Sequence, residues 1–170
     1  MHQGKSTPVS DTAALPALFP PLTAATLGTI LLGGILADAT WEIWARFITP
    51  FWVGGPLQPA ALVQSVFGFR NLALAELIHL VVGVVFYPIG YLYIARPIAD
   101  RFLPFLPWPV VALGYGVGLW TFALYVMAHL IAGFPAFLGF IQLTWASLVG
   151  HLLFALVLGA VVQRRLPAPR

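Results

Sequence analysis

The chain has 170 residues, of which 61% are hydrophobic and only 8% are charged. A soluble domain carries roughly a quarter charged residues, so this composition excludes a soluble protein and predicts an integral membrane protein of one domain. The net charge of +3 comes from basic residues near the ends of the apolar segments, which argues against nucleic-acid binding, and the absence of cysteine excludes disulfides, thiolate metal sites and c-type haem attachment.

The hydropathy pattern predicts four transmembrane helices. Residues 1–21 are rich in Pro, Ser and Thr and are predicted to form a disordered tail rather than a cleaved signal, and residues 164–170 form a basic tail. A helix that crosses a hydrocarbon core of ~30 Å needs about 20 apolar residues. The segments between residues 22 and 163 that meet this length are Leu22–Phe47, Leu72–Ala95, Pro109–Ala132 and Gln142–Val162. The fold class is therefore an all-α membrane protein, a four-helix transmembrane bundle.

The connection between the first two spans contains a shorter apolar stretch, Pro59–Phe69. It is too short to cross the bilayer, so we expect a short re-entrant or interfacial helix.

The basic residues predict the orientation, because cytoplasmic connections of membrane proteins carry an excess of Lys and Arg. One side has Lys5, Arg96, Arg101, Arg164, Arg165 and Arg170, whereas the other has Arg46 and Arg70. Both termini are therefore expected in the cytoplasm, with the protein in a bacterial inner membrane. Tryptophans near the outer ends of the spans are expected to form an aromatic belt; they are Trp41, Trp44, Trp52 and Trp145.

Six ionisable residues lie inside the predicted spans, where an unpaired charge costs at least a few kcal/mol. At 1.5 Å per residue, they lie about 6–15 Å from the outer ends of their spans, in the outer half of the bilayer. They are Asp38, Glu42, Glu76, His79, His129 and His151.

Small residues mark the faces on which transmembrane helices approach closely, and each ionisable residue shares such a face. The glycines concerned are Gly34, Gly83, Gly90, Gly114, Gly118 and Gly159. We therefore expect the six polar side chains to form one cluster that opens toward the outer side.

The chemistry of this cluster predicts a metal site. Glu76 and His79 are spaced i, i+3, the spacing with which helices of di-iron bundles present ligands, although here the motif occurs once. Together with His129, His151, Asp38 or Glu42, they suit iron, zinc or copper. Glu42 has a second interpretation, because Arg46 follows it at i, i+4 and is placed to pair with it.

Other functions stay open at this stage. A b-type haem electron carrier requires two facing histidines, which His79, His129 and His151 supply. A non-catalytic scaffold subunit, packed against larger membrane proteins or a second copy of itself, requires only that the polar residues fix helix register. The sequence contains no phosphate-binding loop, nucleophile elbow or HExxH motif, so it does not predict hydrolase or kinase chemistry and leaves open whether the protein is an enzyme.

The spacing of glycine and histidine residues in the last three spans, Leu72–Val162, resembles that of the small four-span YagU-like inner-membrane proteins of unknown function. The segments that carry the resemblance are IHLVVGVVFYPIGYLY, GYGVGLWTFALYVMAHLIAGFP and ASLVGHLLFALVLGAV. They include His79 with Gly83 and His151 with Gly159. The resemblance implies the same architecture and no particular activity.

Overall fold

The computed structural model describes residues 19–167, and all regular secondary structure within them is helical. Four helical segments are long and apolar enough to cross a membrane: Ala24–Val53, Leu72–Phe102, Trp108–Ile131 and Gln142–Arg165. The predicted four-helix transmembrane bundle is confirmed, with its first two helices longer than predicted. Most of the predicted N-terminal tail, and the last three residues of the C-terminal one, lie outside the described residues.

The first span consists of α1 (Ala24–Ile43), the π-helical turn η1 (Trp44–Ile48) and the short α2 (Pro50–Val53). Thr23 caps its start, because the side-chain oxygen accepts a hydrogen bond from a backbone N–H of the first turn at 3.2 Å. Gly54 ends it in the left-handed conformation, with φ 79°, which favours glycine at a helix C-terminus.

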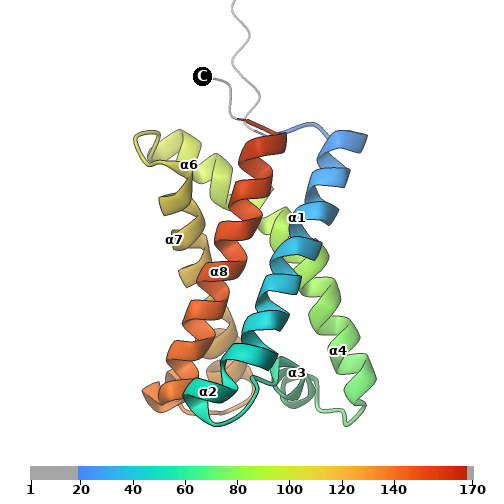
Figure 1. Ribbon diagram of the computed structural model, residues 1–170, viewed down its shortest axis with the longest axis vertical. Helices are drawn as coiled ribbons and strands as arrows, with labels where there is room; N and C mark the ends of the chain where they lie inside the picture. Colours follow the sequence, from blue (N-terminus) through green and yellow to red (C-terminus); the bar gives the residue numbers. More distant parts are fainter. Residues whose placement is uncertain (1–18, 168–170) are drawn as a thin grey trace, which may run out of the picture.

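The predicted connecting helix is α3 (Pro59–Phe67), of which only Ala60 is buried. It ends at Gly68, which has φ 71°. α3 packs against both α4 (Leu72–Val81) and η4 (Phe122–Ile131), so it bridges the second and third spans. Figure 1 shows α3 at the same end of the bundle as α2, opposite the end at which α1 begins and α8 finishes.

The second span continues from α4 through η2 (Val82–Phe86), α5 (Tyr87–Gly90), η3 (Tyr91–Ala95) and α6 (Arg96–Phe102). Its alternation of α and π turns follows from its prolines, because a proline has no N–H to donate to the carbonyl four residues earlier. The turns η1, η2 and η3 each end two residues before a proline, namely Pro50, Pro88 and Pro97.

The third span joins α7 (Trp108–Thr121) to η4, and the one-turn helix η5 (Ala136–Phe140) leads to α8 (Gln142–Arg165). η5 is left-handed over several residues, including Phe137 with φ 49°. This conformation is strained for residues other than glycine.

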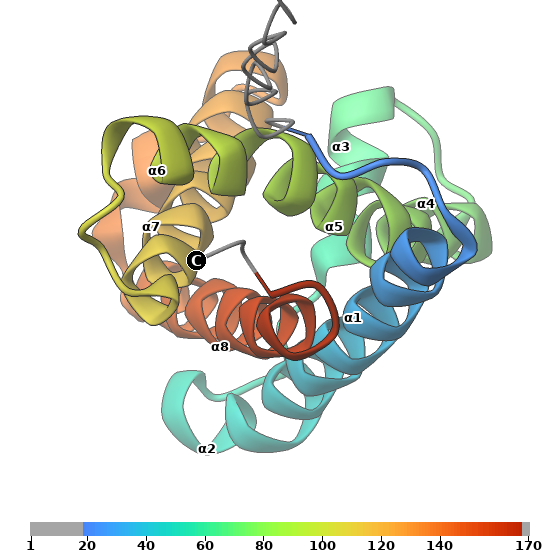
Figure 2. The ribbon, with the colours of Figure 1, turned by 90° about the horizontal axis from the view of Figure 1, so that it is seen from above.

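The helix α8 is the centre of the packing, because it lies along both α1 and α7 (Figure 2). Glycines permit the close approach of the helices. A Cβ on Gly116 of α7 would lie 2.8 Å from the His151 carbonyl oxygen of α8. A Cβ on Gly34 of α1 would lie 2.7 Å from the Val84 Cα of η2.

The prediction for the third span was wrong in one respect. Gly114 and Gly118 are exposed, and a Cβ on either would meet no atom of residues 19–167 within 4 Å. The face of α7 that packs against α8 contains Ala112 and Gly116 instead.

Candidate functional site

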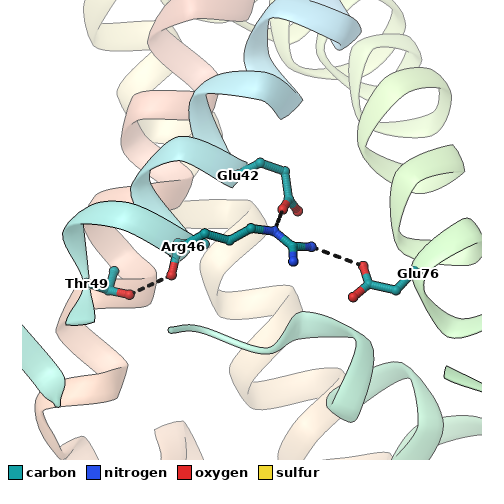
Figure 3. Close-up of polar contacts among 5 residues, drawn as sticks. Glu42, Arg46, Thr49 and Glu76 are labelled. Atoms are coloured by element: carbon teal, nitrogen blue, oxygen red, sulfur yellow. Dashed lines mark hydrogen bonds and ion pairs between the residues drawn. The ribbon is translucent and has the colours of Figure 1, made fainter. Parts of the chain in front are cut away.

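The six ionisable residues divide into three groups, and the first is an ion-pair cluster near the C-terminal end of the first span (Figure 3). Arg46 donates from Nε to the Glu42 carboxylate, and its Nη2 lies 3.5 Å from Glu76 Oε2. Below it, the Thr49 hydroxyl donates to the Ala45 carbonyl oxygen at 2.7 Å. The predicted Glu42–Arg46 pair is confirmed, and Arg46 joins the first span to the second.

The second group consists of His129 alone, which the sequence predicted to lie in one cluster with the other five ionisable residues. Its Nδ1 is 2.7 Å from the Phe134 carbonyl oxygen, and its ring lies 5.4 Å from the Tyr125 ring. His129 therefore fixes the end of η4 and is not among the residues that line the cavity described next. Its predicted place in one common cluster is wrong, because η4 turns it away from the other spans.

The third group lines a cavity of about 600 Å³ in the same end of the bundle. The walls are formed by α3, by α4 and η2 of the second span, and by η4 of the third, and they consist largely of apolar side chains. The polar residues Asp38, His79, Ser147 and His151 line it as well. Three of the six predicted residues are therefore brought to one cavity.

Two of these residues, Asp38 and His151, are deeply buried, whereas His79 is partly exposed. Asp38 is 6% exposed and His151 is 7% exposed. Gly83 of η2 makes room for the carboxyl group, since a Cβ at that position would lie 3.3 Å from Asp38 Cγ. A larger residue at position 83 would displace the Asp38 carboxyl group from its present position.

The ring of His151 has a defined orientation. Its Nδ1 lies 2.8 Å from the Ser147 carbonyl oxygen, which only accepts, so Nδ1 carries the proton and donates it. In the neutral ring this leaves Nε2 as an acceptor.

Trp41 lies between the two histidines and is the residue that sequence reasoning missed. Its ring centroid is 4.6 Å from that of His151 and 6.3 Å from that of His79. It is 6% exposed and packs over Gly150 of α8, so its predicted place in an aromatic belt is wrong. The signal in the sequence was its spacing of three residues from Asp38, which places both on one helix face.

The polar end contains groups without partners. Within residues 19–167, the Trp41 indole N–H is buried and has no hydrogen-bond acceptor. The ion pairs of the same residues use Glu42, Glu76 and Asp100 as their acidic members, so Asp38 belongs to none of them. An unpaired buried polar group costs about 1–3 kcal/mol, which a bound molecule with complementary groups would recover.

The described part of the chain contains no group of three or more His, Asp or Glu side chains arranged to hold a metal ion. The predicted metal site of six residues is thus not assembled, because Glu42 and Glu76 face Arg46 and His129 faces Phe134.

The cavity walls also contain two of the π-helical segments, η2 and η4. Such segments are rare in proteins and are frequent at functional sites.

Fold and composition define a small integral membrane protein with an internal cavity. Comparison with protein-family models, with curated proteins and with solved structures finds no match to this chain. The resemblance to the YagU-like proteins stays a prediction.

Proposed function

We propose that this protein binds a lipid-soluble molecule inside the membrane, in the cavity between its second and third spans. The observation that carries the proposal is an apolar cavity of about 600 Å³ with buried, incompletely paired polar groups at one end. Ligand sites typically measure roughly 300–1,000 Å³ and combine apolar walls with a few placed polar groups. The apolar walls would hold the body of the ligand, and Asp38, Trp41 and His151 would hold its polar head.

Access from the bilayer is supported by three phenylalanines. Phe67, Phe86 and Phe122 line the cavity and are also 59%, 60% and 44% exposed. They therefore lie where the cavity meets the apolar surface that lipid covers. A ligand that partitions into hydrocarbon would reach the site without passing through water.

The test uses a bulky side chain in the cavity and a matched one outside it. Ala123 of η4 lines the cavity, whereas Ala73 of α4 is exposed and does not. The purified protein, Ala123→Trp and Ala73→Trp would be extracted with organic solvent, and lipid-soluble compounds would be quantified by mass spectrometry. We expect one compound near stoichiometry in the wild type and in Ala73→Trp, reduced at least several-fold in Ala123→Trp. Equal amounts in all three proteins would refute the proposal.

Whether the site also binds a metal ion is a second question, because Asp38, His79 and His151 line one cavity and belong to residue types that bind metals, although they are not arranged around one ion. Elemental analysis and an absorption spectrum of the same preparation decide it. Near-stoichiometric iron, zinc or copper that disappears in His79→Ala and His151→Ala would establish a metal site, and a Soret band would establish haem. A protein free of metal and of extractable ligand, but bound to another membrane protein, would favour the scaffold function.

We also propose that the termini face the cytoplasm of a bacterial cell, which places the cavity in the outer half of the inner membrane. The proposal is supported by the basic residues of α6 and α8, which lie near the end of the bundle where α1 begins (Figure 1). Because the chain has no cysteine, single substitutions can be labelled without background. We expect Gly55→Cys to react with an impermeant maleimide in intact cells and Arg170→Cys to react only after lysis. The reverse pattern would overturn the orientation.

A further inference from the structure

The charges around the cavity carry an inference about the head of the ligand, and this inference rests on the proposed function. Asp38 is the only acidic residue among the cavity-lining residues of the described chain, and these residues include no Lys or Arg. The carboxyl group therefore has no Lys or Arg partner in the cavity, and the two histidines that line it, His79 and His151, form no ion pair with it among the described residues. A lone carboxylate in the membrane costs several kcal/mol and is normally found with a partner or at a functional site.

The nearest candidate for a partner on the same helix is already used. Arg46 is held between Glu42 and Glu76, on the outer surface of the bundle (Figure 3). Its guanidinium group pairs with these two carboxylates and not with Asp38, which leaves Asp38 as the acid of the first span without an ion pair among the described residues.

The remaining polar groups at this end of the cavity do not replace a cation. His151 donates its Nδ1 proton to the Ser147 carbonyl oxygen, so the nitrogen left to the neutral ring, Nε2, accepts. His151 Nε2 and the Asp38 carboxylate are thus both hydrogen-bond acceptors. The indole of Trp41 adds one buried donor.

Aromatic rings line the cavity. Trp41 lies beside His151 with ring centroids 4.6 Å apart, and Tyr87 and Phe154, which pack edge to face, line it as well. The faces of aromatic rings attract ammonium groups, most strongly where water is excluded. The same rings also accommodate the hydrocarbon body of an amphiphile.

We propose that the ligand is an amphiphilic cation, an organic ammonium compound whose charged head lies against Asp38 and the aromatic rings while its apolar body fills the cavity between η2 and η4. The cation supplies the partner that the protein itself does not provide.

The test compares two fluorescent probes with the same body, diphenylhexatriene and its trimethylammonium derivative. The full-length protein is placed in lipid nanodiscs, and saturable energy transfer from tryptophan to each probe is titrated. We expect both probes to bind, with the cationic probe about tenfold tighter, from the ion pair and the cation–π contacts. This comparison needs no variant.

The variant Asp38→Asn and a control variant, Asp100→Asn, then test whether the Asp38 carboxylate causes the preference for the cationic probe. Asp100→Asn makes the same chemical change on α6, where the carboxylate is 55% exposed and pairs with Arg96 at 3.7 Å, outside this cavity. We expect Asp38→Asn to abolish the preference for the cationic probe while it still binds diphenylhexatriene, and Asp100→Asn to preserve the preference. Circular dichroism confirms that each variant is folded.

The outcomes separate the two proposals. Saturable binding of both probes with equal affinity, or a preference that survives in folded Asp38→Asn, would overturn the cationic head and leave the cavity function intact. If neither probe binds saturably, and Ala123→Trp behaves like the wild type, the cavity function itself fails.

Discussion

Gly34 is the position at which the packing makes its sharpest quantitative prediction. A Cβ there would lie 2.7 Å from both Cα and the carbonyl carbon of Val84, and backbone atoms cannot rotate away as a side chain does. Gly28, almost two turns earlier on the same helix, is the matched control. A Cβ at Gly28 would have only one neighbour within 4 Å, an Arg165 side-chain nitrogen at 3.8 Å.

The magnitude follows from two opposing effects. Replacing glycine by alanine inside a helix stabilises it by about 0.5–1 kcal/mol, and both variants gain this. Over-packing costs typically 1–3 kcal/mol, and only Gly34→Ala incurs that cost. The two variants should therefore differ by about 1–3 kcal/mol in the free energy of unfolding, with Gly28→Ala equal to or above the wild type.

The assay is reversible unfolding in mixed micelles with increasing dodecyl sulfate, followed by tryptophan fluorescence. Because Gly34 lies one turn before Asp38, displacement of α1 from η2 should also weaken the binding of a cavity probe. Two variants of equal stability, within about 0.5 kcal/mol, would show that α1 does not pack on η2 as described.

Three further changes have defined outcomes. Arg46→Gln should lower the stability by no more than about 1 kcal/mol, since the group is half exposed, and combining it with Glu76→Gln should show little additional loss; fully additive losses would contradict the ion pair. Trp120→Phe should cost about 1 kcal/mol in the same unfolding assay, because the indole N–H donates to the Thr144 carbonyl oxygen at 3.1 Å, and an unchanged midpoint would argue against this bond. His129→Ala should retain full affinity for diphenylhexatriene in the nanodisc titration, because His129 does not line the cavity, and a tenfold loss would place it in the site.

Hydropathy was sufficient to predict the spans, because the bilayer imposes a minimum length of apolar helix that few other folds require. The Pro59–Phe69 helix was also predictable, because prolines and glycines separate this apolar stretch from the spans on either side of it. The additional length of the first two helices was not. It depends on π turns that continue the helix through Pro50 and Pro97, where a helix end was expected.

The site was predicted in part, and the difference between His151 and His129 shows why. His151 lies on a regular α-helix that packs along two neighbours, so a count of 3.6 residues per turn places it correctly. His129 lies near the end of a ten-residue π segment, in which hydrogen bonds reach one residue further and the same count drifts. The glycines Gly114 and Gly118 added to the error, because a glycine spacing indicates close packing only when a neighbouring helix is there.

A polar pocket was predicted, but the apolar walls of the cavity were beyond sequence reasoning, because they exist between elements and not within one. The presence of the cavity depends on α3 reaching both α4 and η4. No periodicity in the chain encodes that contact.

The role of α3 has a consequence for how such a protein can diversify. The four long helices must satisfy the bilayer, and their buried faces tolerate few changes, as the glycine contacts show. α3 is under neither constraint, since Ala60 is its one buried residue, yet almost its whole length borders the cavity. The nine residues of α3 can therefore change the apolar wall of the cavity without any change in the helices that cross the membrane, whereas the polar end of the cavity, with Asp38 on α1, is set by those helices.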